Sequence, residues 1–187
     1  MTDSVTFDPV TIGVSSCLLG NRVRYDGNHS HDHYLTDTFG LFCRFVSVCP
    51  EMESGMPVPR EPIQLRGDFQ NPDLVTRETE IDKTLQMKDW IKTKIPVLEQ
   101  EDLCGFVFKS KSPSCGLYRV KVFDDNKKMQ KNGTGLFARA FIENFPDIPV
   151  EESSRLNDPK LREHFIERVF FMQQWRRLLK TDNTLGG

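Results

Sequence analysis

The first apolar segment of the chain reads Thr11-Ile12-Gly13-Val14-Ser15-Ser16-Cys17-Leu18-Leu19. Its composition predicts a buried strand that runs into a polar loop from Gly20 to Gly27. A second apolar run extends from Leu41 to Cys49 and is stopped by a proline. A third, Phe106-Val107-Phe108, precedes the turn Ser112-Pro113-Ser114-Cys115-Gly116. A cysteine therefore lies at or just past the carboxyl end of each of these predicted strands.

Predicted helices separate the strands. An amphipathic helix is predicted from about 80 to 101, and Pro96 should kink or end it. The residues at helical spacing that mark its buried stripe are Ile81, Leu85, Lys88, Ile91, Ile95 and Leu98. Further helices are expected over 136–144 and from Asp158-Pro159, a good N-cap and first helical residue, to about 180. Strands near residues 11, 43, 105 and 148 alternate with helices, which favours an α/β fold. We expect three layers, with a mainly parallel sheet, helices on both faces and a C-terminal helix.

Short strands are also expected outside this alternating pattern. They cover 63–66 and 74–76, and a half-exposed strand extends over 117–123. In the C-terminal helix, the apolar residues at helical spacing predict the buried stripe. These residues are Leu161, Phe165, Val169, Met172 and Leu179.

The composition excludes several classes of protein. At 187 residues and 21.6 kDa, the chain fits one domain with an ample core. Its net charge of -2 gives no overall attraction to nucleic acid. No apolar run approaches the roughly 20 residues that span a bilayer, and Met1 to Ser4 do not resemble a signal peptide. We therefore expect a cytoplasmic protein without membrane contact, whose five cysteines stay reduced.

Three of the cysteines are candidates for one shared site. Because parallel strands bring their carboxyl ends to one edge of a sheet, Cys17, Cys49 and Cys115 should lie near one another. Three thiolates at one edge suit zinc or an iron–sulfur cluster, with one metal position left open. No C-x-x-C spacing is present, so three unrelated cysteines remain the alternative. Cys43 and Cys104 lie within or at the start of apolar runs and are expected to be buried.

Polar residues beside these cysteines are candidates for catalysis. Glu51 follows Cys49 by two residues, and a carboxylate near thiolates or a metal is a natural general acid or base. Away from the cysteines it would be read as a surface glutamate. Ser112 and Ser114 flank the third cysteine and either donate to a bound ligand or cap the turn.

The loop after the first strand offers a cation, an aromatic ring and a carboxylate in Arg24, Tyr25 and Asp26. That set suits a planar polar ligand such as a nucleobase, and the alternative is a plain Asp-Gly turn.

Two further patterns in the chain are weak candidates for ligand binding. His29, His31 and His33 alternate and could not all share one face of a helix, so a metal triplet is not expected there. The glycines of Gly133-Thr134-Gly135 precede a helix and favour a tight turn over a phosphate loop.

Several segments together resemble one family. They are Ser16-Cys17-Leu18-Leu19-Gly20 with Val23-Arg24-Tyr25-Asp26-Gly27, then Cys49-Pro50-Glu51 with Gly55 and Pro57-Val58-Pro59-Arg60, and Ser112-Pro113-Ser114-Cys115-Gly116. Their order is similar to that of the 2-thiouracil desulfurase (TudS-like) family over roughly residues 10 to 152. The resemblance implies a desulfurase domain over 1–152 and a C-terminal helical extension over 153–187. One departure is Ser30, where many relatives are expected to carry lysine.

The resemblance also implies a cofactor and a reaction. It implies a [4Fe-4S] cluster with Cys17, Cys49 and Cys115 as its ligands and an open iron that binds the sulfur of a thiolated pyrimidine. Water then replaces sulfur without net redox change, with Glu51 handling protons and Ser112 positioning the substrate. The implied partner is a free thiolated nucleobase or nucleoside, with tRNA possible. In the substrate site, we assign candidate binding roles to Arg24, Tyr25, Asp26 and Ser114.

Two other functions are compatible with the same residues. One is a non-catalytic iron–sulfur or metal-binding module that senses iron or oxygen, or delivers sulfur. The other is a thiol enzyme with Cys115 as its nucleophile, for which Cys17 and Cys49 would be dispensable.

Overall fold

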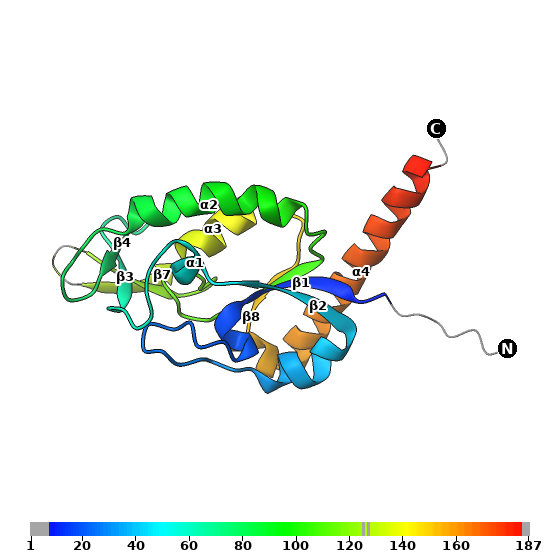
Figure 1. Ribbon diagram of the computed structural model, residues 1–187, viewed down its shortest axis with the longest axis horizontal. Coiled ribbons are helices and arrows are strands. Elements are labelled where there is room, and N and C mark those ends of the chain that lie inside the picture. The colour runs from blue at the N-terminus through cyan, green and yellow to red at the C-terminus, as the bar shows by residue number, and fades with distance from the viewer. Residues whose placement is uncertain (1–7, 125, 127, 185–187) are drawn as a thin grey trace.

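The computed structural model describes residues 8–124, 126 and 128–184 of the chain (Figure 1). The expectation about Met1 to Ser4 lies outside these residues. A parallel sheet forms the centre, with strand order β2-β1-β5-β8. Its strands are β1 (Val10–Ser15), β2 (Cys43–Val48), β5 (Gly105–Phe108) and β8 (Val150–Glu152). The predicted α/β fold with a parallel sheet is thus confirmed, with β8 beginning two residues later than expected.

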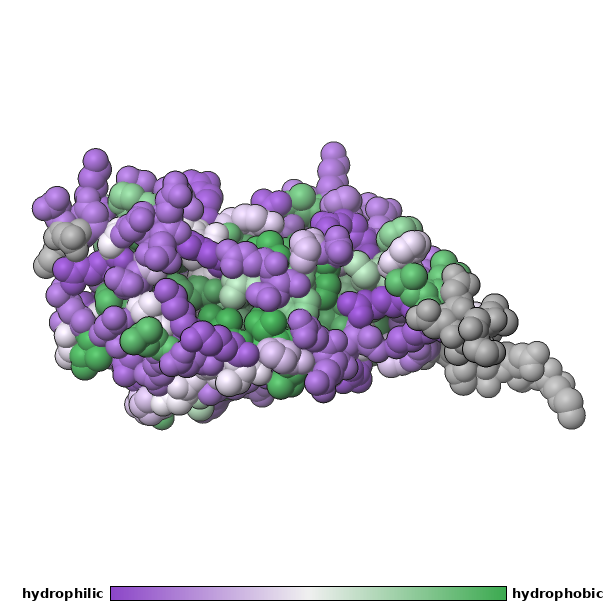
Figure 2. Space-filling view, turned by 90° about the horizontal axis from the view of Figure 1, so that it is seen from above, coloured by the Kyte–Doolittle hydropathy of each residue, from purple (hydrophilic) through white to green (hydrophobic). Residues whose placement is uncertain are grey.

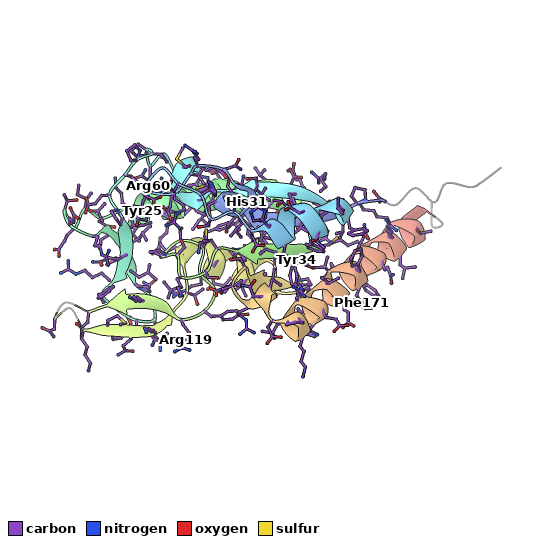
Figure 3. All side chains as sticks on the ribbon, turned by 90° about the horizontal axis from the view of Figure 1, so that it is seen from below. Tyr25, His31, Tyr34, Arg60, Arg119 and Phe171 are labelled. Carbon is purple, nitrogen blue, oxygen red and sulfur yellow. The ribbon has the colours of Figure 1, made fainter. Side chains whose placement is uncertain are left out.

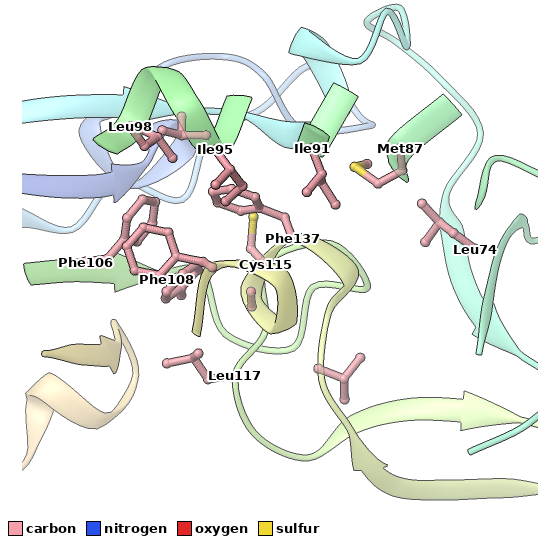
Figure 4. Close-up of a cluster of buried hydrophobic side chains, with 14 of the residues drawn as sticks. Leu74, Met87, Ile91, Ile95, Leu98, Phe106, Phe108, Cys115, Leu117 and Phe137 are labelled. Atoms are coloured by element: carbon pink, nitrogen blue, oxygen red, sulfur yellow. The ribbon is translucent and has the colours of Figure 1, made fainter. Parts of the chain in front are cut away.

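Apolar clusters cover both faces of this sheet, because the strands alternate their side chains. Phe106 and Phe108 face α2 (Thr84–Glu99) and α3 (Leu136–Asn144) in one cluster (Figure 4). The other cluster contains β1 residues, Val107 and the first half of α4 (Pro159–Thr184). A Cβ on Gly13 would lie 2.2 Å from the Phe106 ring, so only glycine lets this ring lie flat on β1.

A second, mixed sheet lies beside the first and has the strand order β4-β3-β6-β7. Its strands are β3 (Ile63–Arg66), β4 (Asp73–Thr76), β6 (Val120–Phe123) and β7 (Met129–Gly133). The first two match the predicted short strands. β6 begins later than predicted because residues 117–119 belong to the loop that follows Cys115. β7 was not predicted, since its residues are mostly polar and exposed.

The amphipathic helix departs from its prediction in two respects. Pro96 does not end α2, which continues through it to Glu99, and the helix begins at Thr84 and not near residue 80. The buried stripe consists of Thr84, Met87, Ile91, Ile95 and Leu98, while Leu85 is 72% exposed. The predicted stripe was therefore wrong at the N-terminal end of the helix.

Residues 29–39, whose composition favours a helix only moderately, are helical only in their second half. Residues 28–32 are irregular, and they lead into a π-helix, η2 (Tyr34–Thr38), and a 3₁₀-helix, η3 (Phe39–Phe42). Another 3₁₀-helix, η1 (Ser16–Leu19), follows β1 directly.

α4 begins as predicted and then leaves the body of the molecule (Figure 1). The Asp158 carboxylate accepts the N–H of Lys160 at 2.9 Å, which confirms it as the N-cap. Phe165 and Val169 are buried, whereas Leu179 is 48% exposed, so the predicted stripe was wrong at its C-terminal end. Figure 2 shows apolar side chains beside the grey terminal atoms at this end. Within the described residues, no helix has the length and apolarity to cross a membrane.

Candidate active site

A cavity of about 870 Å³ opens at the carboxyl ends of the parallel strands, and Cys17, Cys49 and Cys115 all line it. The chain runs from β1 outward to β2 and later returns to β5 on the other side of β1. Open α/β sheets bind their ligands at such a reversal of strand order. The second sheet forms the opposite wall of this cavity. The structure therefore brings the three predicted cysteines to one site.

Cys17 is held by the turn that ends β1. Gly20 adopts a left-handed conformation with φ of 87° and donates its N–H to the Cys17 carbonyl at 3.4 Å, and Ser30 donates to the same oxygen at 2.9 Å. Burial raises the pKa of the Cys17 thiol to about 11. The cation of Lys109 opposes this shift, whereas the nearby Cys49 and Glu51 charges add to it.

Cys49 precedes α1 (Pro50–Glu53) and is held by the first turn of this helix. Its N–H donates to the Glu53 carboxylate at 2.8 Å, and its carbonyl accepts the Glu53 N–H at 2.9 Å. Burial raises the pKa of the Cys49 thiol, and the backbone N–H of Met52 opposes this shift.

Cys115 lies in a turn that rests on the N-terminus of α3. The Ser114 carbonyl accepts the N–H groups of Phe137 and Ala138 at 3.0 and 3.2 Å, and the Pro113 carbonyl accepts that of Leu136. The free N–H groups of this helix end are thereby satisfied by the cysteine turn, which excludes a phosphate loop there. Cys115 borders both the cavity and the apolar cluster (Figure 4). Burial raises the pKa of its thiol, and the charges of Glu51 and Cys17 raise it further.

The support for this turn depends on Gly135. A Cβ at this position would lie 2.5 Å from the carbonyl carbon of Ser114 and 2.8 Å from the Cys115 nitrogen. We expect Gly135→Ala to lower the free energy of unfolding by about 1–3 kcal/mol, because backbone must move to admit the methyl group. Thermal unfolding measures this loss. An unfolding temperature of Gly135→Ala that equals the wild-type value would contradict the prediction.

Glu51 is enclosed in the cavity wall and is not a surface glutamate. Arg60 contacts its Oε2 through Nη2 at 2.5 Å and Nε at 3.0 Å. The Glu51 side chain is only 16% exposed, and the Arg60 side chain only 6%. Arg60 is itself held by the carbonyls of Val23 and Pro57, at 2.9 and 3.1 Å. This pairing fixes the position of the carboxylate and compensates its charge in a partly buried setting.

The two serines of the turn connect Glu51 to the third cysteine. Ser114 is fully buried and donates its hydroxyl to Glu51 Oε1 at 2.8 Å. Ser112 Oγ lies 2.9 Å from Ser114 Oγ and accepts the N–H groups of Ser114 and Cys115, both at 3.2 Å. Ser112 therefore caps the turn, and the direct neighbour of the carboxylate is Ser114.

The loop after η1 contributes two of its three candidate residues to the cavity. Arg24 and Tyr25 line it, and their side chains lie against one another at 5.6 Å from guanidinium carbon to ring centre. Asp26 is not among the lining residues. Its carboxylate accepts the Asn28 N–H at 3.1 Å and lies 3.4 Å from Arg24, so it stabilises the turn. Ser30 accepts a hydrogen bond from Arg24 at 3.0 Å.

Sequence reasoning missed the cationic character of the cavity. In the described part of the chain, its lining includes two carboxylates, Glu51 and Glu152, and a much larger set of cations. These cations are Arg24, Arg60, Arg77, Lys109, Lys111, Arg119, Lys121, Lys131 and Arg155. Figure 3 shows Arg119 opposite Tyr25 and Arg60. The run Lys109-Ser110-Lys111 beside the cysteine turn was the available signal, whereas the cations of the second sheet had none.

Two of these cations have a backbone conformation that side chains rarely adopt. Lys111 and Arg119 have φ values of 62° and 55°, in the left-handed region. Such strain persists where the surrounding structure enforces it, and it concentrates at ligand sites. The two residues flank the cysteine turn, so the same loop presents both a thiol and cations to the cavity.

The donor set fits a metal cluster better than a single ion. Sulfur atoms around one tetrahedral zinc lie about 3.8 Å apart, given a Zn–S bond of about 2.3 Å. Of the described residues, the three cysteines do not form a set whose ligand atoms all lie within 4.8 Å of one another. Thiols at this wider spacing suit separate metal atoms of one cluster. A positive centre would also stabilise the thiolates that burial disfavours.

Comparisons with known proteins agree with this site. A family model described as 2-thiouracil desulfurase matches residues 12–153. The uncharacterized protein YbbK of Bacillus subtilis (strain 168) is 32% identical over 109 residues, or 55% of this chain and 71% of YbbK. The structure of the [4Fe-4S]-dependent thiouracil desulfidase TudS matches with a TM-score of 0.64 and 27% identity, over 83% of this chain and 98% of TudS.

The family match extends from β1 to just past β8 and therefore includes all three cysteines and Glu51. It confirms the resemblance drawn from the motifs. Since the family model covers most of the sequence, this chain belongs to the 2-thiouracil desulfurase family.

Proposed function

We propose that this protein is a desulfurase that converts a thiolated pyrimidine to its oxo form with a [4Fe-4S] cluster bound by Cys17, Cys49 and Cys115. The observation that carries the proposal is the meeting of these cysteines with the Glu51–Ser114 pair in one cavity. The similarity to TudS, a [4Fe-4S]-dependent thiouracil desulfidase, supports the choice of cofactor.

The proposed reaction is a hydrolysis. One water molecule is consumed, the C=S bond becomes C=O, and hydrogen sulfide leaves, so no electrons are gained or lost. When bound, a cluster with three cysteine ligands supplies an open iron, a Lewis acid that polarises C=S and accepts the sulfur. The protein must then position the pyrimidine, activate water and transfer its protons.

We assign the proton transfers to Glu51. Its Oε2 is occupied by Arg60, so Oε1 is the oxygen available for a proton from the attacking water. Ser114 donates to this same oxygen and orients it. Ser112, one hydroxyl further along, is proposed to position the substrate. Arg60 acts through Glu51 and is a positioning residue.

The cavity supports a substrate larger than a free base. Tyr25, which is 40% exposed, offers a ring on which a pyrimidine can stack. The cations that line the cavity complement a phosphate group. The substrate class that fits best is a thiolated pyrimidine nucleotide; the free base, the nucleoside and tRNA are the other members of the class.

Sulfide release by anaerobically reconstituted protein tests the function. We expect broad iron–sulfur absorption and a kcat/KM for 2-thiouridine 5′-monophosphate at least about tenfold above that for 2-thiouracil, because one charged hydrogen bond supplies about 1.5–3 kcal/mol. Lys111→Ala should reduce this preference and leave the free base unaffected. Absence of both the absorption and sulfide release would refute the desulfurase; equal kcat/KM values would refute the nucleotide preference alone.

The domain boundary and cell compartment are part of the same proposal. We place the desulfurase domain at residues 1–152 and a helical extension at 153–187. Phe165 and Val169 of α4 are buried against the sheet, so the first half of the extension shares the core. A cytoplasmic location suits the site, because a reducing compartment keeps the three thiols free to bind metal.

A second candidate function is a cluster-binding module for sensing or sulfur delivery. The same three cysteines would serve it, but the buried Glu51–Arg60 pair and the Ser114 hydroxyl would have no chemical task. The module therefore accounts for fewer of the observed contacts than the enzyme does.

A further inference from the structure

A cluster of histidines lies outside the cavity, in the segment that connects η1 to η2 (Figure 3, His31). His31 and His33 have ring centres only 4.3 Å apart. The sequence argument against a shared face assumed a helix, but this segment is irregular before His33. Because the helix is absent there, the objection to a shared face does not apply, and the two imidazoles lie beside one another.

We propose that His31, His33 and Asp37 form a binding site for a divalent transition-metal ion, separate from the cysteine site. One ligand atom from each of these residues lies within 4.8 Å of the others. His33 Nδ1 and Asp37 Oδ2 are already 3.1 Å apart. Two such ligands around one zinc ion, at bond lengths of about 2.0–2.2 Å, are separated by about 3.4 Å. Small side-chain shifts are thus sufficient to admit an ion.

The π-helix η2 positions the carboxylate. Leu35 is fully buried and anchors this turn, so that Thr36 and Asp37 face the histidines. Thr36 Oγ1 lies 2.6 Å from Asp37 Oδ1 and His33 Nδ1 lies 3.1 Å from Asp37 Oδ2, so both carboxylate oxygens are held beside the imidazoles.

A chain of hydrogen bonds prepares His31 as a ligand. Thr36 Oγ1 lies 2.6 Å from Asp37 Oδ1 and must donate to it, because a carboxylate only accepts. The same hydroxyl oxygen, 2.9 Å from His31 Nε2, therefore accepts a proton from that ring nitrogen. This arrangement leaves the lone pair of neutral His31 on Nδ1. Metal-binding histidines commonly have their second nitrogen fixed by such a partner.

The choice of metal follows from the ligands. Two imidazoles and one carboxylate suit zinc, cobalt, nickel or copper, whereas calcium and magnesium prefer oxygen ligands. Because the His33 and Asp37 side chains are 78% and 63% exposed, water can complete the coordination.

The site is also connected to the first cysteine. Ser30 and Asp32 donate their N–H groups to the carbonyls of Cys17 and Leu18, both at 2.9 Å. The His31 ring lies beside Gly20, where a Cβ would be 3.7 Å from it. An ion bound by the histidines would therefore restrict the movement of this loop relative to the turn that holds Cys17. None of the three proposed ligands lines the cavity, so the site is physically distinct from it.

Zinc titration of the cluster-loaded protein tests the proposal, with the imidazole nitrogens followed by ¹⁵N–¹H NMR. The chain has four histidines, and His164 on α4 is the internal control. We expect the ring signals of His31 and His33 to shift with one equivalent of zinc while that of His164 does not. His33→Ala and Asp37→Asn should each weaken zinc binding by at least about tenfold.

The readout does not depend on desulfurase activity, so the proposed function and this site can fail separately. His164→Ala is the matched control and should bind zinc like the wild type. Since His33 and Asp37 are exposed, their variants should unfold at the wild-type temperature. Zinc binding that is absent, or that is equally strong in His33→Ala and Asp37→Asn, would overturn the proposal.

Discussion

Glu51→Gln is expected to lower kcat for sulfide release by about 10²–10⁴-fold while the protein keeps its cluster. The amide has the size of the carboxylate, but its one oxygen can accept from either Ser114 or Arg60 and not from both. It cannot take a proton from water. Anaerobic turnover, measured with the iron–sulfur absorption of the same sample, separates lost chemistry from lost cofactor.

Glu61→Gln is the control for this substitution. Glu61 follows Arg60 in the chain, but its carboxylate binds Thr79 at the surface, away from the cysteines. We expect wild-type turnover from it. If Glu51→Gln retained turnover within about threefold of wild type, Glu51 would not be the proton-transfer group, and the binding module would become the better reading of the site.

Serine at any one of the three cavity cysteines is expected to remove both cluster and activity. Cys17→Ser, Cys49→Ser and Cys115→Ser each delete one of three thiolates, and a cluster with two remaining protein ligands should be retained at less than about a tenth of the wild-type level. Iron and sulfide analysis beside the sulfide-release assay measures this effect. The substitution is nearly isosteric, so folding should persist even at the buried Cys115.

Cys43→Ala and Cys104→Ala control for general damage from losing a thiol. Cys104 is buried in the second apolar cluster and Cys43 packs against it, away from the cavity lining. Both variants should retain cluster and turnover. A thiol enzyme predicts a different pattern, in which Cys115→Ser alone is inactive. Full activity in Cys17→Ser or Cys49→Ser would therefore exclude the shared site.

The strand ends could be predicted from sequence because strong local signals mark them. β1, β2 and β5 are mostly apolar runs, and parallel strands bring their carboxyl ends to the same edge of a sheet. The site followed from this topology, since Cys17, Cys49 and Cys115 come at those ends. Periodicity alone was sufficient for the existence of α2, though not for its buried face.

The rest of the site depends on contacts between distant segments. Arg60 follows an irregular proline-rich segment, and no pattern in the sequence indicates that its guanidinium reaches Glu51. The polar edge strand β7 carries Lys131 into the cavity without any apolar signal. The histidine pair was missed for the opposite reason, because a helix was assigned to a segment that is irregular until His33.

The seating of the Cys115 turn on α3 has a consequence for how the protein matures. This turn is completed by Phe137 and Ala138, which leave the ribosome after all three cysteines have been synthesised. The Cys115 turn has its native hydrogen bonds only when α3 is in place, so we expect the three thiols to come together late in folding. Until then the raised pKa values of the three thiols keep them protonated, which slows their oxidation. Burial of the three thiols thus limits their oxidation before the cluster binds, and the same burial encloses the cluster afterwards.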